Sequence, residues 1–301
     1  MSSFDLTQLN QAFAIPGQLS FQQHPSGLVV AEIDNAHARA GVFLQGAQLT
    51  RWTPHRQVPV IWLSPAAKFA EGKAIRGGIP VCWPWFGAHD TEPELPAHGY
   101  ARTSVWEVVK AATGEDGATC LVLRLLAKRP SLWPHETPLE IRLVVGQTLA
   151  IELVTRNLGT EPVLVRQALH TYFQVADVRQ VEIHGLDGYP YLDKLDGVRK
   201  QQAGAVVFSG ELDRVYLDQG GYCLIDDPGL QRHIRIAKRG SHSTIVWNPW
   251  SEKAAKLGDM GEDGHLGMVC VESANADEDV VRLEPGAEHG LRVEYSVEDH
   301  H

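Results

Sequence analysis

The chain has 301 residues, of which 44% are hydrophobic and 21% are charged, a composition typical of a folded protein and not of a disordered one. Its formal charge of −10 at pH 7 argues against a protein that binds nucleic acids and against a basic protein of membrane surfaces. An anionic ligand would therefore need a local cluster of arginines that overcomes the overall negative charge.

The N-terminal stretch MSSFDLTQLNQAF lacks both the basic and the apolar segment of a secretory signal, so we expect none. No apolar run approaches the ~18–20 residues that span a bilayer. The four cysteines are scattered without a CxxC pair, and three of them lie in apolar, strand-like stretches. We expect free, mostly buried thiols and a cytoplasmic location.

Strand patterns predominate along the chain, and helical patterns are few and short. Residues 7–13 (TQLNQAF) predict the first helix. A second helix is predicted at residues 251–258, with Ser251 as its N-cap and Gly258 at its end. Short strands are predicted at residues 28–33, 40–44 and 48–52.

Residues 75–87, with the sequence IRGGIPVCWPWFG, do not fit an ordinary central strand. Pro80 and Pro84 cannot donate hydrogen bonds to a sheet, and Gly77 and Gly78 favour conformations that other residues avoid. The segment predicts a stiff, aromatic and irregular loop.

Three pairs of strand-like stretches predict β-hairpins. The first has alternating apolar residues from Leu139 to Leu153 around a turn near Gly146. The others are residues 222–237, around Asp227-Pro228-Gly229, and residues 280–297, around Pro285-Gly286. Because strands and helices do not alternate, we predict a single all-β domain over residues 1–301, an antiparallel β-sandwich of some twenty strands.

Residues 162–175 (PVLVRQALHTYFQV) predict a strand with two unlike faces. One face is apolar, and the other carries Arg166, His170 and Tyr172. Such a strand fits the wall of a binding cleft. A solvent-facing strand with an idle histidine explains the same pattern.

Glu272 lies within the apolar stretch GMVCVESAN, residues 267–275. A carboxylate in such a run is costly to bury unless it is paired or functional, and burial would raise its pKa toward that of a general base. Alternatively, Glu272 lies at a strand end where it emerges into water.

Three further polar residues are weaker candidates. His98 and Arg102 lie at a junction between a loop and a strand, where binding sites often occur. A surface salt bridge from Arg102 and a hydrogen-bonded His98 are the simpler interpretation of these two residues taken alone. Asp213 adjoins Arg214, and a surface ion pair is the simpler interpretation.

Several chemistries lack a motif in this sequence. There is no HExxH motif, no HxH cluster and no ligand spacing of cysteine and histidine, so no metal site is predicted. GxGxxG, Walker and GxSxG motifs are also absent, so the chemistries that these motifs indicate are set aside. Histidine, carboxylate, arginine and aromatic residues remain, and aromatic faces and polar groups suit sugar rings and their hydroxyls.

Taken together, these segments resemble the aldose 1-epimerase (mutarotase) superfamily, and within it most closely the hexose-6-phosphate mutarotases. The resemblance runs from about residue 25 to residue 297 as an ordered series of segments. They are GAQLTRW (46–52), IRGGIPVCWPWFG (75–87), HGYART with Trp106 (98–106), ALHTYF (168–173), LDRVY (212–216), VWNPW (246–250) and VCVESAN (269–275).

The resemblance implies an antiparallel β-supersandwich of the galactose mutarotase type, with a few short helices, that interconverts the α and β anomers of an aldohexose 6-phosphate. It implies His170 and Glu272 as the catalytic pair. The substrate-binding residues it implies are Arg76, His98, Arg102 and Asp213, with the two arginines on the phosphate. The family's usual phenylalanine in HGxAR is here Tyr100, which leaves the catalytic pair untouched.

The implied mechanism needs only proton transfer, with no metal, cofactor or covalent intermediate. Glu272 would take the proton of the C1 hydroxyl as general base, and His170 would protonate the ring oxygen as general acid. The aldehyde then rotates and the ring closes on its other face. We expect a bell-shaped pH dependence and a monomer whose partner is a small sugar phosphate, with glucose 6-phosphate as the expected substrate.

Three other functions remain open from the sequence. One is a mutarotase of unphosphorylated aldoses, which would not need Arg76 and Arg102. Another is a non-catalytic carbohydrate-binding β-sandwich, which would need no acid–base pair. The third is a glycoside hydrolase or lyase, but a hydrolase normally uses two carboxylates and only Glu272 is a firm candidate.

Overall fold

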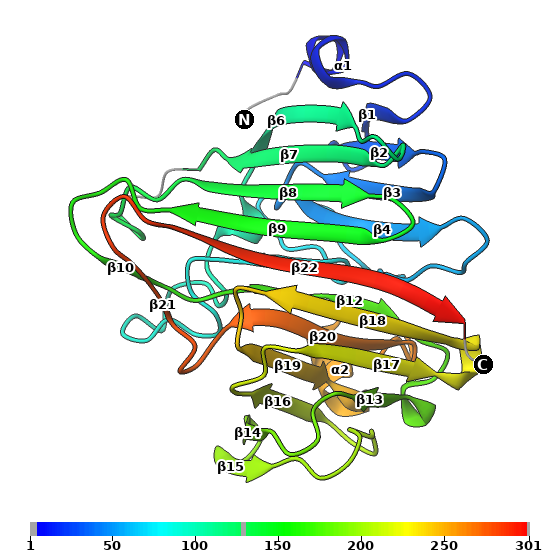
Figure 1. Cartoon of the computed structure of the whole chain (residues 1–301), viewed down its shortest axis with the longest axis vertical. Coiled ribbons are helices and arrows are strands. Elements are labelled where there is room, and N and C mark those ends of the chain that lie inside the picture. The colour runs from blue at the N-terminus through cyan, green and yellow to red at the C-terminus, as the bar shows by residue number, and fades with distance from the viewer. Residues whose placement is uncertain (1–4, 128–130, 300–301) are drawn as a thin grey trace.

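Alternating apolar residues build one layer of a β-sandwich, an eight-stranded sheet (Figure 1). The computed structural model describes residues 5–127 and 131–299, so the first four residues of the N-terminal stretch lie outside it. In order across this sheet the strands are β13 (Glu182–His184), β17 (Tyr222–Asp227), β18 (Arg232–Arg239), β22 (Glu288–Asp299), β9 (Leu149–Arg156), β8 (Leu139–Val145), β7 (Thr119–Leu125) and β6 (Trp106–Thr113).

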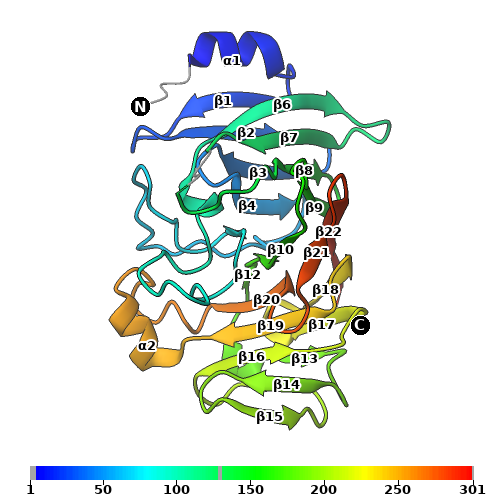
Figure 2. The ribbon, with the colours of Figure 1, turned by 90° about the vertical axis from the view of Figure 1, so that its left-hand side faces the viewer.

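The other layer consists of two sheets, which follow one another along the long axis of the molecule in Figure 2. One has the strands β1 (Leu19–Gln23), β2 (Val29–Asp34), β3 (Ala38–Phe43) and β4 (Gln48–Pro54). The other, here called the site sheet, has β15 (Val198–Gln201), β14 (Pro190–Asp193), β16 (Leu212–Tyr216), β19 (Ser243–Asn248), β20 (Met268–Asn275), β11 (Gln167–Leu169) and β5 (Val81–Cys82), with β12 (Tyr172–Gln174) also paired to β20.

Few elements lie outside these layers. Helix α1 (Leu6–Phe13) follows Asp5, whose carboxylate accepts hydrogen bonds from the amides of Thr7 and Gln8. The remaining elements are α2 (Trp250–Leu257), the 3-10 helices η1 (Ala101–Thr103), η2 (Val178–Gln180) and η3 (Pro228–Leu230), and the two-stranded sheet of β10 (Val163–Val165) and β21 (Val281–Leu283).

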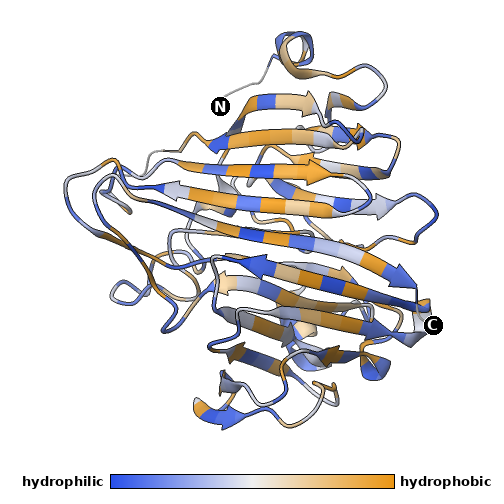
Figure 3. Cartoon of the chain, viewed as in Figure 1, coloured by the Kyte–Doolittle hydropathy of each residue, from blue (hydrophilic) through white to orange (hydrophobic). Residues whose placement is uncertain are grey.

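The main hydrophobic core lies between the two layers. Along β8 and β9 the inward apolar residues from Leu139 to Leu153 alternate with outward residues, several of which are charged, and Figure 3 shows the alternation of hydropathy. Their inward side chains are at most 1% exposed. The hairpin predicted around Gly146 is confirmed, as is the hairpin of β17 and β18.

The third predicted hairpin, around Pro285-Gly286, is wrong. Strand β22 pairs with β18 on one side and β9 on the other, so both of its edges are occupied. Strand β21 instead pairs with β10, and the turn carries the chain from one sheet to another.

Two predicted element boundaries are also wrong. The strand expected over residues 162–175 is three short strands, β10, β11 and β12, because β10 leaves the site sheet to pair with β21. Helix α2 begins at Trp250, whose amide donates to Asn248 Oδ1 at 2.8 Å, so Ser251 is not its N-cap. Gly258 ends the helix in a left-handed conformation, as predicted.

The segment 75–87 forms an irregular edge of the site sheet in which only Val81 and Cys82 are assigned as strand. Its prolines cannot donate, but their carbonyls accept: Pro80 O accepts from the amide of His170, and Pro84 O from that of Arg166, both at 3.0 Å. Prolines are tolerated there because an edge segment does not need a hydrogen-bond donor at every position.

The glycines of this segment allow a close approach of three chain segments. Gly78 has φ +70°, and a Cβ atom there would lie 2.4 Å from the carbonyl oxygen of Leu49. Its own carbonyl accepts from the amide of Tyr172 at 3.0 Å. Gly78 therefore docks the segment onto β4 on one side and β12 on the other.

We expect the substitution Gly78→Ala to destabilise the fold more than Gly72→Ala. Gly72 has nearly the same φ, +69°, but nothing lies within 4 Å of an added Cβ. Gly72→Ala should cost about 1 kcal/mol for the left-handed backbone alone, and Gly78→Ala roughly 1–3 kcal/mol more for the steric clash. Urea denaturation measures both free energies of unfolding, and equal losses would contradict the docking role of Gly78.

Candidate active site

The register of the site sheet places His170 opposite Glu272. Leu169 pairs with Ser273 on one side of the break between β11 and β12, and Tyr172 pairs with Cys270 on the other. Both pairs belong to the same antiparallel register, which continues through the break and aligns residue 170 with residue 272. Residues directly opposite one another carry their side chains on the same face of a sheet.

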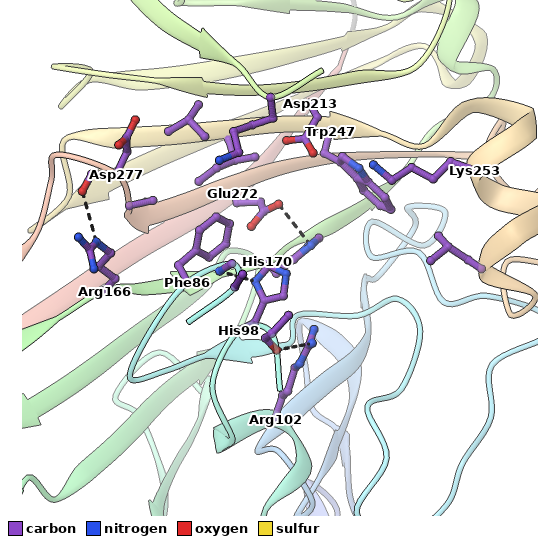
Figure 4. A pocket seen from close by; sticks show the side chains of 18 of the residues that line it. Phe86, His98, Arg102, Arg166, His170, Asp213, Trp247, Lys253, Glu272 and Asp277 are labelled. Carbon is purple, nitrogen blue, oxygen red and sulfur yellow. Dashed lines mark hydrogen bonds and ion pairs between the residues drawn. The ribbon is translucent and has the colours of Figure 1, made fainter. Parts of the chain in front are cut away.

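His170 and Glu272 are in contact on that face. His170 Nε2 lies 3.4 Å from Glu272 Oε1, and the two side chains are 11% and 1% exposed (Figure 4). Their other polar atoms, His170 Nδ1 and Glu272 Oε2, have no hydrogen-bond partner within the described part of the chain. The pair therefore has a buried donor or acceptor position on each residue that a ligand can satisfy.

Burial disfavours the charged form of both residues. It lowers the pKa of His170 well below its ordinary value, and the neighbouring His98 and Arg102 lower it further. It raises the pKa of Glu272 well above its ordinary value, and Asp213 adds to this shift while Arg102 opposes it. The pair thus favours a state with one proton in total over a wide pH range.

His98 lies beside the pair in a conformation that leaves one ring nitrogen for a ligand. It has φ +67°, and its Nδ1 accepts from the amide of Gly87 at 3.3 Å, so the neutral ring carries its proton on Nε2. The ring centroid is 5.9 Å from that of His170 and 4.8 Å from that of Phe86. Burial, together with Arg102 and Arg76, lowers the pKa of His98 to about 3.

Arg76 and Arg102 line the same pocket. Arg76 donates through Nε to Asp259 Oδ1 at 2.9 Å and through Nη1 to the hydroxyl of Tyr172 at 3.0 Å. Arg102 donates through Nη2 to the carbonyl of Ala97 at 2.9 Å. Each guanidinium has five N–H donors, so both retain donors for a ligand.

The pocket has a volume of about 600 Å³ and brings together all six residues singled out in the sequence, Arg76, His98, Arg102, His170, Asp213 and Glu272. Five cationic side chains and four acidic ones line it. That volume is typical of small-molecule sites. The near balance of charges in the lining contrasts with the chain's net charge of −10.

The surface ion pair expected between Asp213 and Arg214 does not form, and His170 on the 162–175 strand is buried and not solvent-facing. Arg214 donates to Gln202 and lies over the ring of Tyr191, so it does not pair with Asp213. Asp213 is opposite Trp247 on β19, which places it in the row of side chains next to Glu272. Burial raises the pKa of Asp213, and Lys253 and Lys194 oppose the shift.

Several lining residues were not assigned a role from the sequence. Phe86 is the aromatic residue of segment 75–87 that lines the pocket, whereas Trp83 and Trp85 pack in the main core. The alternation of β16 and β19 could have indicated Trp247, which shares the face of Asp213. Arg166 shares the predicted polar face of His170, whereas nothing in the local pattern distinguishes Lys194 and Lys253 from surface cations.

Comparison with known proteins shows which family this chain belongs to. The family described as aldose 1-epimerase matches residues 30–296. The chain is 36% identical over 249 residues to a protein of Escherichia coli (strain K12) named "Putative glucose-6-phosphate 1-epimerase", a match that covers 82% of this chain and 83% of that protein. A protein of Cenchrus ciliaris with the same name is 33% identical over 286 residues, covering 91% and 86%. The chain belongs to the aldose 1-epimerase family and is an isomerase.

Solved structures agree with the predicted fold. A Salmonella typhimurium protein described as "a putative mutarotase (YeaD)" superposes with a TM-score of 0.87 at 31% identity, over 97% of this chain and 99% of that one. A galactose 1-epimerase from Lactobacillus acidophilus NCFM is 14% identical with a TM-score of 0.67, over 94% and 99%, which concerns the fold alone. The predicted all-β supersandwich is confirmed.

Among residues 5–127 and 131–299, no helix has the length and apolar character to cross a bilayer.

We expect NMR titration to find the imidazole of His170 neutral well below pH 6.5. Arg102→Gln removes a positive charge that opposes protonation of His170, so the pKa of His170 should rise in that variant. Histidine ¹H–¹⁵N correlation spectra, assigned with His170→Gln, measure both values. Arg142→Gln, which changes an arginine outside the pocket, serves as the control. A pKa of His170 at or above about 6.5 would contradict the assigned electrostatics.

Proposed function

We propose that this protein interconverts the α and β anomers of an aldohexose 6-phosphate, with glucose 6-phosphate as its substrate. The observation that carries the proposal is the buried contact of His170 Nε2 and Glu272 Oε1 in a pocket that is also lined by Arg76 and Arg102. Opening a hemiacetal needs one proton acceptor and one proton donor, and this pair supplies both. The names of the relatives from E. coli and C. ciliaris support the same substrate.

The proton count of the pair suits the reaction. In the active arrangement Glu272 is ionised and takes the proton of the C1 hydroxyl, while protonated His170 gives its proton to the ring oxygen. The same single proton can sit on Glu272 in the empty pocket, because burial disfavours both charges. Since a second proton binds His170 at low pH and the last leaves Glu272 at high pH, these shifts widen the expected bell-shaped profile.

A bound phosphate would also assist His170. The positive charges of Arg102 and Arg76 lower the pKa of His170 in the empty pocket. A phosphate held by these arginines offsets their charge, so the pKa of His170 rises and the imidazolium becomes a better populated acid. Substrate binding and activation of the acid are thereby linked.

The remaining groups suit the sugar ring. Phe86 offers an aromatic edge or face, and the Nε2–H of His98 and the carboxylate of Asp213 offer one donor and acceptors for hydroxyls. We also propose a monomer, because every group of the site comes from one chain. Free thiols at all four cysteines support a reducing, cytoplasmic location.

We expect His170→Gln and Glu272→Gln each to lower the rate of anomerisation by ~10²–10⁴-fold, because each removes one partner of the proton transfers. Exchange NMR with glucose 6-phosphate, corrected for the spontaneous reaction, measures the rate. The matched control is Glu278→Gln, a carboxylate that is 65% exposed and paired with Arg199.

Rates near that of the wild type in either folded variant would contradict the catalytic pair. Sugar phosphate binding without anomerisation by the wild type would instead support the non-catalytic carbohydrate-binding module.

We expect Arg102→Gln to raise the Michaelis constant for glucose 6-phosphate by roughly 10–100-fold, since charge-assisted hydrogen bonds contribute roughly 1.5–3 kcal/mol. The constant for glucose should change little. Arg282→Gln, which alters an exposed arginine paired with Glu284, controls for the loss of one positive charge. Equal increases with both sugars would overturn the phosphate assignment and favour a mutarotase of free aldoses.

A further inference from the structure

Three aromatic rings form a continuous stack that ends on His170. The rings of Trp62 and Tyr172 have centroids 5.8 Å apart and planes inclined by 20°. Tyr172 and His170 have centroids 4.9 Å apart and planes inclined by 9°. Because stacked rings resist tilting, this arrangement holds the plane of the imidazole and the direction of its Nε2 toward Glu272.

Hydrogen bonds also hold the backbone of this stack in place. The amide of Trp62 donates to the carbonyl of Tyr172, and the amide of Tyr172 donates to the carbonyl of Gly78, each at 3.0 Å. The support for the imidazole therefore does not depend on side-chain packing alone.

The hydroxyl of Tyr172 reaches the arginine of the proposed phosphate site. It accepts from Arg76 Nη1 at 3.0 Å, while Arg76 Nε donates to Asp259 Oδ1 at 2.9 Å. Two partners on different elements thus orient the guanidinium. Three of its five N–H donors have no partner within the described ranges and are available to a ligand.

Tyr172 itself is 2% exposed and does not line the pocket. It touches His170 with its ring and Arg76 with its hydroxyl, and its ring also lies 6.0 Å from that of Trp247. It therefore acts on the substrate only through residues that line the pocket. A purely structural tyrosine would need neither contact.

We propose that Tyr172 is a positioning residue that holds the general acid His170 and the phosphate-binding Arg76 in a constant relation to each other. Its ring sets the orientation of the imidazole, and its hydroxyl sets that of the guanidinium. The inference rests on the proposed function, and it adds that phosphate recognition and proton transfer share one support.

Two substitutions separate the two contacts. Tyr172→Phe keeps the stack and removes the hydroxyl, so the Michaelis constant for glucose 6-phosphate should rise roughly tenfold with kcat within about twofold and glucose unaffected. The inhibition constant of inorganic phosphate should rise in parallel. Tyr172→Leu removes the stack and should lower kcat by roughly 10²-fold with both sugars, because a small misorientation of the acid is costly.

The matched control is Tyr216→Phe, which removes another fully buried hydroxyl. That hydroxyl donates to Gln202 at 2.8 Å and does not touch the site. Its kinetic constants should equal those of the wild type, while thermal unfolding reports the stability of every variant. If Tyr172→Leu does not fold, the kinetic constants of Tyr172→Phe and its inhibition constant for phosphate decide whether Tyr172 is a positioning residue.

Unchanged constants for glucose 6-phosphate and phosphate in Tyr172→Phe would overturn the inference. So would an equal rise for glucose, or a wild-type kcat in folded Tyr172→Leu. These outcomes differ from failure of the proposed function, in which the wild-type protein itself would not anomerise glucose 6-phosphate.

Discussion

The antiparallel register between β20 and the pair β11 and β12 is the constraint on which the site depends. It runs unbroken across the gap at residues 170 and 171, although the strand itself is interrupted there. Because of this register, His170 lies directly opposite Glu272, and a shift by one residue would turn one of them into the main core. Where the strand is interrupted, segment 75–87 provides a hydrogen-bond acceptor for the backbone, because the amide of His170 donates to the carbonyl oxygen of Pro80.

Strand β20 explains how a carboxylate can lie inside an apolar sequence. All eight of its residues are buried, because one face packs in the main core and the other faces a second cluster that surrounds the pocket. Glu272 shares this second face with Met268 and Cys270. Burial makes the ionised form of Glu272 costly. The fold tolerates this carboxylate because His170 lies within contact distance of it. The same burial that makes the ionised form costly raises the pKa of Glu272, which makes the carboxylate a stronger proton acceptor.

Much of the fold was predictable from local patterns, but the connections between sheets were not. Alternation from Leu139 to Leu153 predicts a hairpin because each strand contacts its neighbour in the chain. The turn at Pro285-Gly286 carries the same local signal, yet β22 finds its partners in β9 and β18, far away in the sequence. Local chemistry specifies a turn and leaves the sheet that each flanking strand joins undetermined.

The functional site, like the fold, was only partly predictable from the sequence. His170 and Glu272 stood out by parity and burial, although each pattern also fitted an idle residue, and the ordered motifs of the family made the difference. Trp62 and Asp259 did not stand out, because their contacts join segments that are far apart in the sequence and carry no common pattern. Tyr172 stood out only as a neighbour of His170 on the polar face of its strand, and its contact with Arg76 was not predictable. Residues that touch a substrate are recognisable by their chemistry, whereas residues that support them are recognisable only by their geometry.

The charges of the pocket show why such support matters in an acidic protein. Most cationic side chains there are already paired: Arg76 with Asp259, Arg166 with Asp90 and Lys253 with Glu211. A carboxylate partner orients a cation but also cancels part of its charge. A phenol hydroxyl orients the cation without cancelling its charge. Tyr172 stays neutral, because burial raises its pKa. Tyr172 therefore helps to hold Arg76 toward the pocket without cancelling more of its charge than Asp259 already does.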